Sequence, residues 1–128
     1  MAEPLLKAKA RVIDVRKQVI PRMYAVTAET EDGTVFEFDS HEDLVTYKVG
    51  DELNIELSRD IPEYRDGIDF VGRGTVASIR EEDNRLSVLI SIGGLLFIVR
   101  TAPGKLQLKP TEKVYVKIAK LTPAQGST

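Results

Sequence analysis

Strict alternation of apolar and polar residues runs through most of the chain, and no segment of helical length carries an apolar stripe with a 3.6-residue period. Such alternation is typical of β-strands that face the core on one side and solvent on the other. In the first half of the chain it predicts four strands, over about 6–16, 24–29, 36–39 and 51–57.

Local departures from the alternation predict how these strands are shaped and joined. After Val12 the apolar positions shift by one residue, which indicates a β-bulge inside the first strand. The pair Asp32-Gly33 predicts a turn with positive φ at both central positions. Ser40 indicates a cap for one or two helical turns that reach Tyr47.

The second half begins after a break in the pattern. Residues 58–73, SRDIPEYRDGIDFVGR, contain proline and glycine and predict a connection. Beyond it we expect strands over about 75–80, 86–92, 95–100 and 113–121, with tight turns at 82–84 and 93–94. Residues 122–128, TPAQGST, predict a disordered tail, which leaves residues 1–121 as a single domain.

The two halves align with each other at a shift of 61 residues. Gly33 then falls on Gly94 and Phe36 on Phe97, and no gap is needed between Tyr24 and Leu57. A chance match between two alternating hairpins would look similar, so a true repeat stays one of two interpretations. Either way, each half supplies about four strands. The predicted fold is all-β: an OB-like antiparallel barrel of about eight strands, built from two similar halves with little helix.

Composition narrows the class of protein. With 128 residues, 42% apolar and 30% charged, the chain fits one folded domain rather than a disordered or membrane-spanning protein. It has no cysteine, so disulfides and thiolate metal sites are excluded. The net charge of −2 gives no general attraction to nucleic acid. The first residues lack the apolar core of a secretory signal, so we expect a cytoplasmic protein.

Candidate catalytic and ligand-binding groups are few. His41 is the only histidine, so any Ser-His-Asp triad would run through it, yet its polar neighbours favour a solvated imidazole. Asp60, Glu63, Asp66 and Asp69 recur every three residues, but Arg59 and Arg65 among them would repel a cation. Residues 72–77 match G-x-G-x-x-A without the helix that a dinucleotide site needs. We therefore expect no cofactor, metal or small-molecule substrate.

Single-stranded nucleic acid is the ligand class that OB-like barrels bind on basic grooves with aromatic platforms. Tyr24, Phe36 and Phe38 lie on predicted inward faces, and Phe97 lies in an apolar run. Tyr115 is different, because it stands between Lys113 and Lys117 on a predicted outward face. Because of this small cluster, a free DNA- or RNA-binding barrel stays an alternative function. A weak contact with nucleic acid within a larger complex is a second possibility.

The most unusual segment is the uncharged apolar run over residues 86–99, in which ten of fourteen positions are apolar. One face of this hairpin is expected to pack into the core. Leu89, Leu96 and Ile98 lie on the opposite face. An antiparallel hairpin normally leaves that face polar. We expect it to be covered, either by the central connection or N-terminal strand of this chain, or by a partner protein.

The same hairpin carries a family resemblance. SIGGLL at 91–96 resembles the most distinctive signature of subunit 8 of archaeal and eukaryotic DNA-directed RNA polymerase, known in archaea as the G subunit. RDIPEYRDGIDFVGRGTV at 59–76 and EKVYVKIAKL at 112–121 are similar to the connection and closing strand of that family. The resemblance covers about residues 8–121. It departs at the compact turn 80–85, where eukaryotic members carry a longer insertion.

The resemblance implies a noncatalytic, OB-like barrel subunit that docks outside the polymerase on its largest subunit. It implies no catalytic residue, metal or membrane contact. The residues that we expect to bind the partner lie in the hairpin and in the connection: Ser91, Gly93, Gly94, Leu95, Leu96, Arg59, Tyr64 and Arg73.

Overall fold

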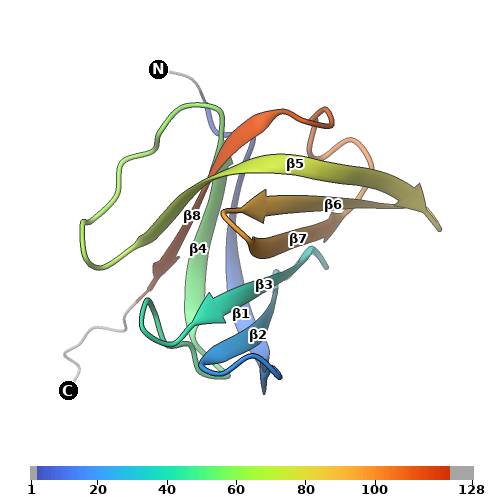
Figure 1. The fold of residues 1–128 in the computed structure, drawn as a ribbon. Helices are drawn as coiled ribbons and strands as arrows, with labels where there is room; N and C mark the ends of the chain where they lie inside the picture. Colours follow the sequence, from blue (N-terminus) through green and yellow to red (C-terminus); the bar gives the residue numbers. More distant parts are fainter. Residues whose placement is uncertain (1–2, 122–128) are drawn as a thin grey trace.

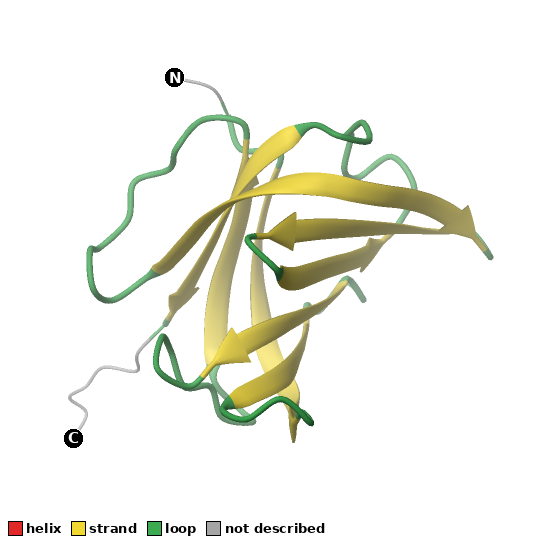
Figure 2. Ribbon diagram, viewed as in Figure 1, coloured by secondary structure: helices red, strands yellow, loops and turns green. Residues whose placement is uncertain are grey.

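Eight antiparallel strands close into a barrel around the apolar face that the alternation predicts, as the computed structural model shows for residues 3–121 (Figures 1 and 2). The strands are β1 (Leu6–Lys17), β2 (Met23–Glu29), β3 (Val35–His41), β4 (Glu52–Ser58), β5 (Phe70–Glu82), β6 (Arg85–Ile92), β7 (Leu95–Thr101) and β8 (Lys113–Lys120). Around the barrel their order is β1-β2-β3-β7-β6-β5-β8-β4. The predicted all-β barrel is confirmed. No helix that could cross a membrane occurs in the described part of the chain.

Alternate residues of each strand fill the barrel with aliphatic and aromatic side chains. Phe36, Phe38 and Phe97 come from both halves of the chain, and Phe97 lies 5.9 Å from Phe36 and 5.8 Å from Phe38, measured between ring centroids. All three are at most 4% exposed. Each such ring stabilises the folded state by roughly 1.5–3 kcal/mol through burial. The core therefore ties the two halves together.

The barrel consists of two copies of one four-strand unit, β4-β1-β2-β3 and β8-β5-β6-β7. The bulge predicted after Val12 is present, and the other unit has its counterpart after Val76. Val12 N donates to Asp51 O at 2.8 Å, and Val76 N donates to Glu112 O at the same distance. The units meet at β3–β7 and at β4–β8, on opposite sides of the ring.

The structure favours the repeat but corrects its gapless alignment. The offset is 61 residues between Phe36 and Phe97, yet the register places Ala28 opposite Phe36 and Ile90 opposite Phe97, an offset of 62 for β2 and β6. The reason is the length of the connection between the paired positions, because seven residues separate Ala28 from Phe36 and six separate Ile90 from Phe97.

Three local expectations are wrong. Residues 40–47 form no helix, because Ser40 Oγ donates to the carbonyl of Val45 at 3.0 Å instead of capping a helical turn. Strand β5 begins at Phe70 rather than near Thr75, so the glycines of the G-x-G-x-x-A match lie inside a strand. In the turn before β3, only Gly33 has positive φ, at 92°.

The two glycine- and asparagine-containing hairpin turns are as predicted. Asp83 and Asn84 have φ of 51° and 60°, and Gly93 and Gly94 have φ of 58° and 96°. Left-handed pairs of this kind match the twist of the flanking strands. The predicted tail 122–128 lies outside the described residues.

Equivalent loops close the two ends of the barrel. Tyr47 in the loop before β4 and Leu106 in the loop before β8 are 7% and 4% exposed. Next to Tyr47 a cavity of about 20 Å³ remains, lined also by Leu44, Leu95 and Phe70. This volume holds about one water molecule. The cavity is therefore too small for an organic ligand.

The repeat predicts the effect of exchanging one residue for its counterpart. Gly50 and Thr111 occupy the same place before β4 and β8, donate to Val12 O and Val76 O at 2.8 Å, and have φ of 98° and 70°. A threonine in this conformation is strained by about 1–2 kcal/mol, and a glycine costs about 0.5–1 kcal/mol in unfolded-state entropy. We expect Thr111→Gly to raise the free energy of unfolding by about 0.5–1 kcal/mol in urea denaturation.

The reciprocal change serves as its control. Gly50→Thr should lower the free energy of unfolding by about 1 kcal/mol, since the site has open space and only the backbone conformation opposes a side chain. A lower urea midpoint for Thr111→Gly than for the wild type would contradict this account.

Candidate protein-binding surface

The β6–β7 hairpin is apolar on both faces, as predicted. Val88, Ile90, Phe97 and Val99 point into the core and are at most 1% exposed. On the outer face Leu89 pairs with Ile98 and Ser91 pairs with Leu96, and the Leu96 side chain remains 43% exposed. Three aliphatic side chains thus lie together on the outside of the barrel.

Neither segment of this chain that was expected to cover the hairpin does so. Strand β1 pairs with β2 and β4, far from β6 and β7 in the strand order. The connection 59–69 lies on the β8 side, where Lys117 Nζ donates to Glu63 O at 2.7 Å (Figure 1). Within residues 3–121, the outer face of the hairpin is open.

A wider uncharged area continues from the hairpin onto β5. Register places Thr75 beside Ser91 and Ser78 beside Leu89, so small hydroxyl side chains flank the aliphatic ones. We call this area the uncharged strip. It comprises the outward side chains of Thr75, Ser78, Ser87, Leu89, Ser91, Leu96 and Ile98. A sheet face without long charged side chains lets another protein approach closely.

Asp39 fixes one end of the strip. Regular β3–β7 pairing ends at Phe38 and Phe97, and beyond it the Leu96 N–H donates to Asp39 Oδ2 at 3.0 Å. Asp39 Oδ1 accepts a second hydrogen bond from Gln18 Nε2 at 2.8 Å. The carboxylate therefore replaces a backbone acceptor and holds Leu96 in place with its side chain outward.

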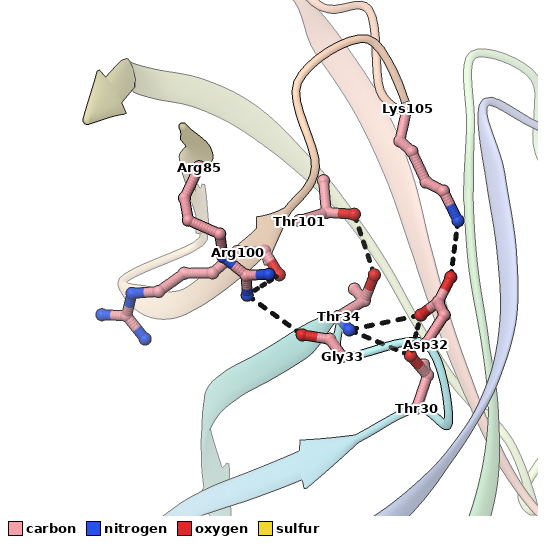
Figure 3. A network of polar contacts seen from close by, with 8 residues as sticks. All are labelled: Thr30, Asp32, Gly33, Thr34, Arg85, Arg100, Thr101 and Lys105. Carbon is pink, nitrogen blue, oxygen red and sulfur yellow. Dashed lines mark hydrogen bonds and ion pairs between the residues drawn. The ribbon is translucent and has the colours of Figure 1, made fainter. Parts of the chain in front are cut away.

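A polar network fixes the other end (Figure 3). The hydroxyls of Thr34 and Thr101 lie 2.8 Å apart and are buried. Arg85 Nη2 donates to Gly33 O at 3.0 Å and to Arg100 O at 3.3 Å, which joins the β2–β3 turn to the end of β7. Both ends of β7 are thus tied to the first half of the chain.

Asp32 links the same turn to the loop before β8. Its carboxylate accepts hydrogen bonds from Lys105 Nζ, from Thr30 Oγ1 and from the Thr34 N–H (Figure 3). The hydrogen bond from Lys105, supported by those from Thr30 and Thr34, holds the pKa of Asp32 well below its ordinary value. Its charged form therefore favours the folded state.

Close packing at Gly74 places β5 against the hairpin. A Cβ at Gly74 would lie 2.7 Å from Ile90 Cγ2 and 2.8 Å from Ser91 O. Both distances are shorter than any normal contact, so only glycine fits there. The glycines of the G-x-G-x-x-A match thus let β5 cross from β8 to β6.

Six of the eight residues predicted to bind a partner lie on the hairpin or on β5, and two lie elsewhere. Ser91, Gly93, Gly94 and Leu96 lie on or beside the strip, whereas Leu95 is half-buried and lines the small cavity at the barrel end. Arg73 lies on β5 directly opposite Tyr115.

The other two predicted residues lie away from the strip. Arg59 pairs with Glu112 and donates to Gln107 O, while Tyr64 lines a shallow groove with Lys117 and Leu121. The structure does not bring these two residues together with the hairpin.

Sequence reasoning did not include Leu89, Ile98, Thr75 or Asp39 in the predicted site. The alternation phase already placed Leu89 and Ile98 on the outer face and could have added them. Asp39 and Thr75 could not be found in this way, because their closeness to the hairpin depends on pairing between the two halves.

The candidate reactive groups are held in local polar contacts. His41 Nδ1 accepts the Asp43 N–H at 3.1 Å. Burial alone would raise the pKa of Asp69, but hydrogen bonds from the side chain and backbone of Arg65 outweigh it and lower that pKa. Among residues 3–121, no three histidine or acidic side chains gather closely enough to hold a metal ion.

The fold and this surface define a small closed antiparallel β-barrel with one exposed, uncharged sheet face. The family model for the G subunit of DNA-directed RNA polymerase matches residues 5–121, and the chain belongs to this family. This confirms the resemblance carried by the SIGGLL hairpin, and it makes the chain a subunit of an RNA polymerase complex.

Two further comparisons extend this result. No curated protein matches the chain at the sequence level. Among solved structures, the chain is similar to the cytoplasmic molybdate-binding protein ModG with molybdate bound, at 17% identity over 92% of each chain and a TM-score of 0.36.

The Asp32 contacts predict a pH-dependent part of the stability. Because the pKa is lowered on folding, the stabilisation is fully present above the unfolded pKa of about 4 and is lost as the pH falls through the lower folded value. We expect Asp32→Asn to lower the melting temperature at neutral pH, and the difference from wild type to shrink below about pH 4. A difference that stays constant down to about pH 2 would contradict this role. Glu31→Gln, in the same turn, is the matched control.

Proposed function

We propose that this chain is a noncatalytic assembly subunit of an archaeal DNA-directed RNA polymerase, and that it docks on the largest subunit through the uncharged strip to support transcription. Family membership supports the polymerase complex as its place of action. The observation that carries the docking proposal is the open apolar face of the β6–β7 hairpin, with Leu96 43% exposed. The resemblance of 59–76 and 112–121 supports the choice of the largest subunit.

Burial of the strip would supply free energy without the cost of removing charges from water. Covering the exposed part of Leu96 is worth about 1–2 kcal/mol, and Leu89 and Ile98 add smaller amounts. Protein interfaces are depleted of charge at their centre and polar at their rim. The strip has this arrangement, since Arg100 and Asp39 border it.

A structural role also fits the polar groups of the barrel. The carboxylates with clearly lowered pKa, Asp32, Asp69 and Glu112, are each held by a lysine or an arginine and are occupied within the fold. The proposal therefore assigns RNA synthesis to other subunits and stabilisation of the assembled enzyme to this one. It also places the chain in the cytoplasm, where an archaeal polymerase works.

Substitutions on the strip should separate docking from folding. Leu96→Asp and Ile98→Asp place a carboxylate on the outer face, so we expect both variants to keep their fold. We expect each to bind polymerase about 100-fold more weakly, since a buried unpaired charge costs about 2–5 kcal/mol. The measurement is recovery of polymerase subunits, in equal amounts, with the tagged chain from its native cells.

Val19→Asp is the matched control, because Val19 is fully exposed away from the strip. Normal recovery of polymerase with Leu96→Asp would overturn the docking surface. Unfolding of that variant would show instead that the hairpin face belongs to the core. Failure of the wild-type chain to recover any polymerase subunit would end the proposal itself.

A second candidate function rests on Tyr115. Arg73 lies directly opposite it on β5, and Lys113 lies two residues away on the same face. A tyrosine beside cations can stack a base and bind its phosphate. With a net charge of −2, we expect no salt-sensitive binding of a labelled single-stranded oligonucleotide by the isolated chain at about 50 mM salt. Binding that weakens with salt and in Tyr115→Ala would favour this second function.

A further inference from the structure

The uncharged strip has opposite charges at its two edges. One row of outward side chains crosses five neighbouring strands: Asp39, Leu96, Ser91, Thr75 and Lys113. The acidic end is on β3, where Glu37 lies beside Asp39 on the same face. The basic end is on β5 and β8, where Arg73 lies two residues from Thr75.

The end groups of this row have no ionic partner within residues 3–121. The hydrogen-bond donors to Asp39 are the Gln18 amide and the Leu96 N–H, both uncharged. Lys113 Nζ donates to the hydroxyl of Thr75 at 2.7 Å, and no carboxylate lies within ion-pair distance of it or of Arg73. Beside the acidic edge, by contrast, Arg100 and Glu37 form an ion pair at 3.2 Å.

The two edges are far enough apart to act separately. Four strand spacings of about 4.8 Å place them about 19 Å from each other along the sheet. This exceeds the screening length of about 8 Å at physiological salt. Strands β3 and β8 are four strands apart in a closed ring of eight, so a segment that follows the row curves around the outside of the barrel. It would meet a negative group at one edge and positive groups at the other, with apolar contact between them.

We propose that the strip binds a segment of the largest polymerase subunit with apolar side chains at its centre, a lysine or arginine over Asp39, and a carboxylate over Arg73 and Lys113. This inference rests on the proposed function and adds the chemistry and the direction of the partner. The opposite charges allow only one orientation of that segment, because the reverse one would bring like charges together at both edges.

The acidic edge argues against nucleic acid as the occupant. A single strand laid along the row would pass its phosphates over Asp39, whose hydrogen-bond donors are uncharged and which repels them. A second copy of this chain would have complementary edges in an antiparallel arrangement. Membership of a polymerase subunit family favours the polymerase segment over the second copy.

The test removes one edge at a time. Asp39→Asn removes the charge and keeps an oxygen that can accept the Leu96 N–H. Arg73→Gln with Lys113→Gln removes the other edge. Glu31→Gln and Lys17→Gln are the matched controls, because both side chains are exposed and lie off the strip. Affinity is measured against polymerase purified without this subunit, at about 50 mM and about 500 mM salt.

We expect each edge variant to bind about fivefold more weakly than wild type at the lower salt, and the difference to vanish at the higher salt. The controls should bind as wild type does. Thermal melts report whether the Asn and Gln variants keep the fold. If Asp39→Asn lowers the melting temperature, its affinity is measured well below the melting temperatures of both the variant and the wild type.

Several results would overturn the inference and leave the docking proposal standing. One is unchanged or tighter binding of either edge variant while Leu96→Asp still fails to bind. Another is self-association of the wild-type chain that both edge variants abolish, which would make a second copy the occupant. A third is loss of oligonucleotide binding in the Arg73 and Lys113 variant with polymerase binding intact. Normal binding of Leu96→Asp would instead refute the docking proposal.

Discussion

Pairing between β3 and β7 is the contact on which the rest of the structure depends. These strands are about 60 residues apart in sequence, and their register joins the two halves of the barrel on one side. The same pairing brings Asp39 to the Leu96 N–H and Thr34 to Thr101. The placement of Leu96 at one end of the hairpin and of Thr101 at the other therefore depends on contact between the two halves.

Divergence between the two copies has given the barrel its distinct faces. At the offset of 61, Glu37 of the first unit corresponds to Ile98 of the second, and Asp39 corresponds to Arg100. The inward positions stay apolar in both units, as Phe36 and Phe97 illustrate. The two units thus share an apolar interior, while the outward residues Glu37 and Asp39 of β3 are acidic and their counterparts on β7 are aliphatic or basic.

The sequence predicted the parts of this molecule that depend on local chemistry. Alternation predicted eight strands but missed the start of β5 at Phe70, and the left-handed turn at Gly93 and Gly94 follows from residues that tolerate positive φ. The helix expected after Ser40 does not form, because the Ser40 hydroxyl donates a hydrogen bond to the Val45 carbonyl. The site was found in part. The alternation pattern placed Leu96 on the outer face. Arg59 and Tyr64 lie away from the hairpin because of where the connection 59–69 lies, and no local sequence pattern determines that position.

Strand β6 lies between β5 and β7, and strand β7 lies between β6 and β3. Along the paired residues, their backbone donors and acceptors are used within the barrel, and no foreign strand can extend the sheet there. Any binding at this face must operate through side chains alone. Evolution can then tune such a contact one substitution at a time, without touching the backbone ladder that keeps the barrel closed.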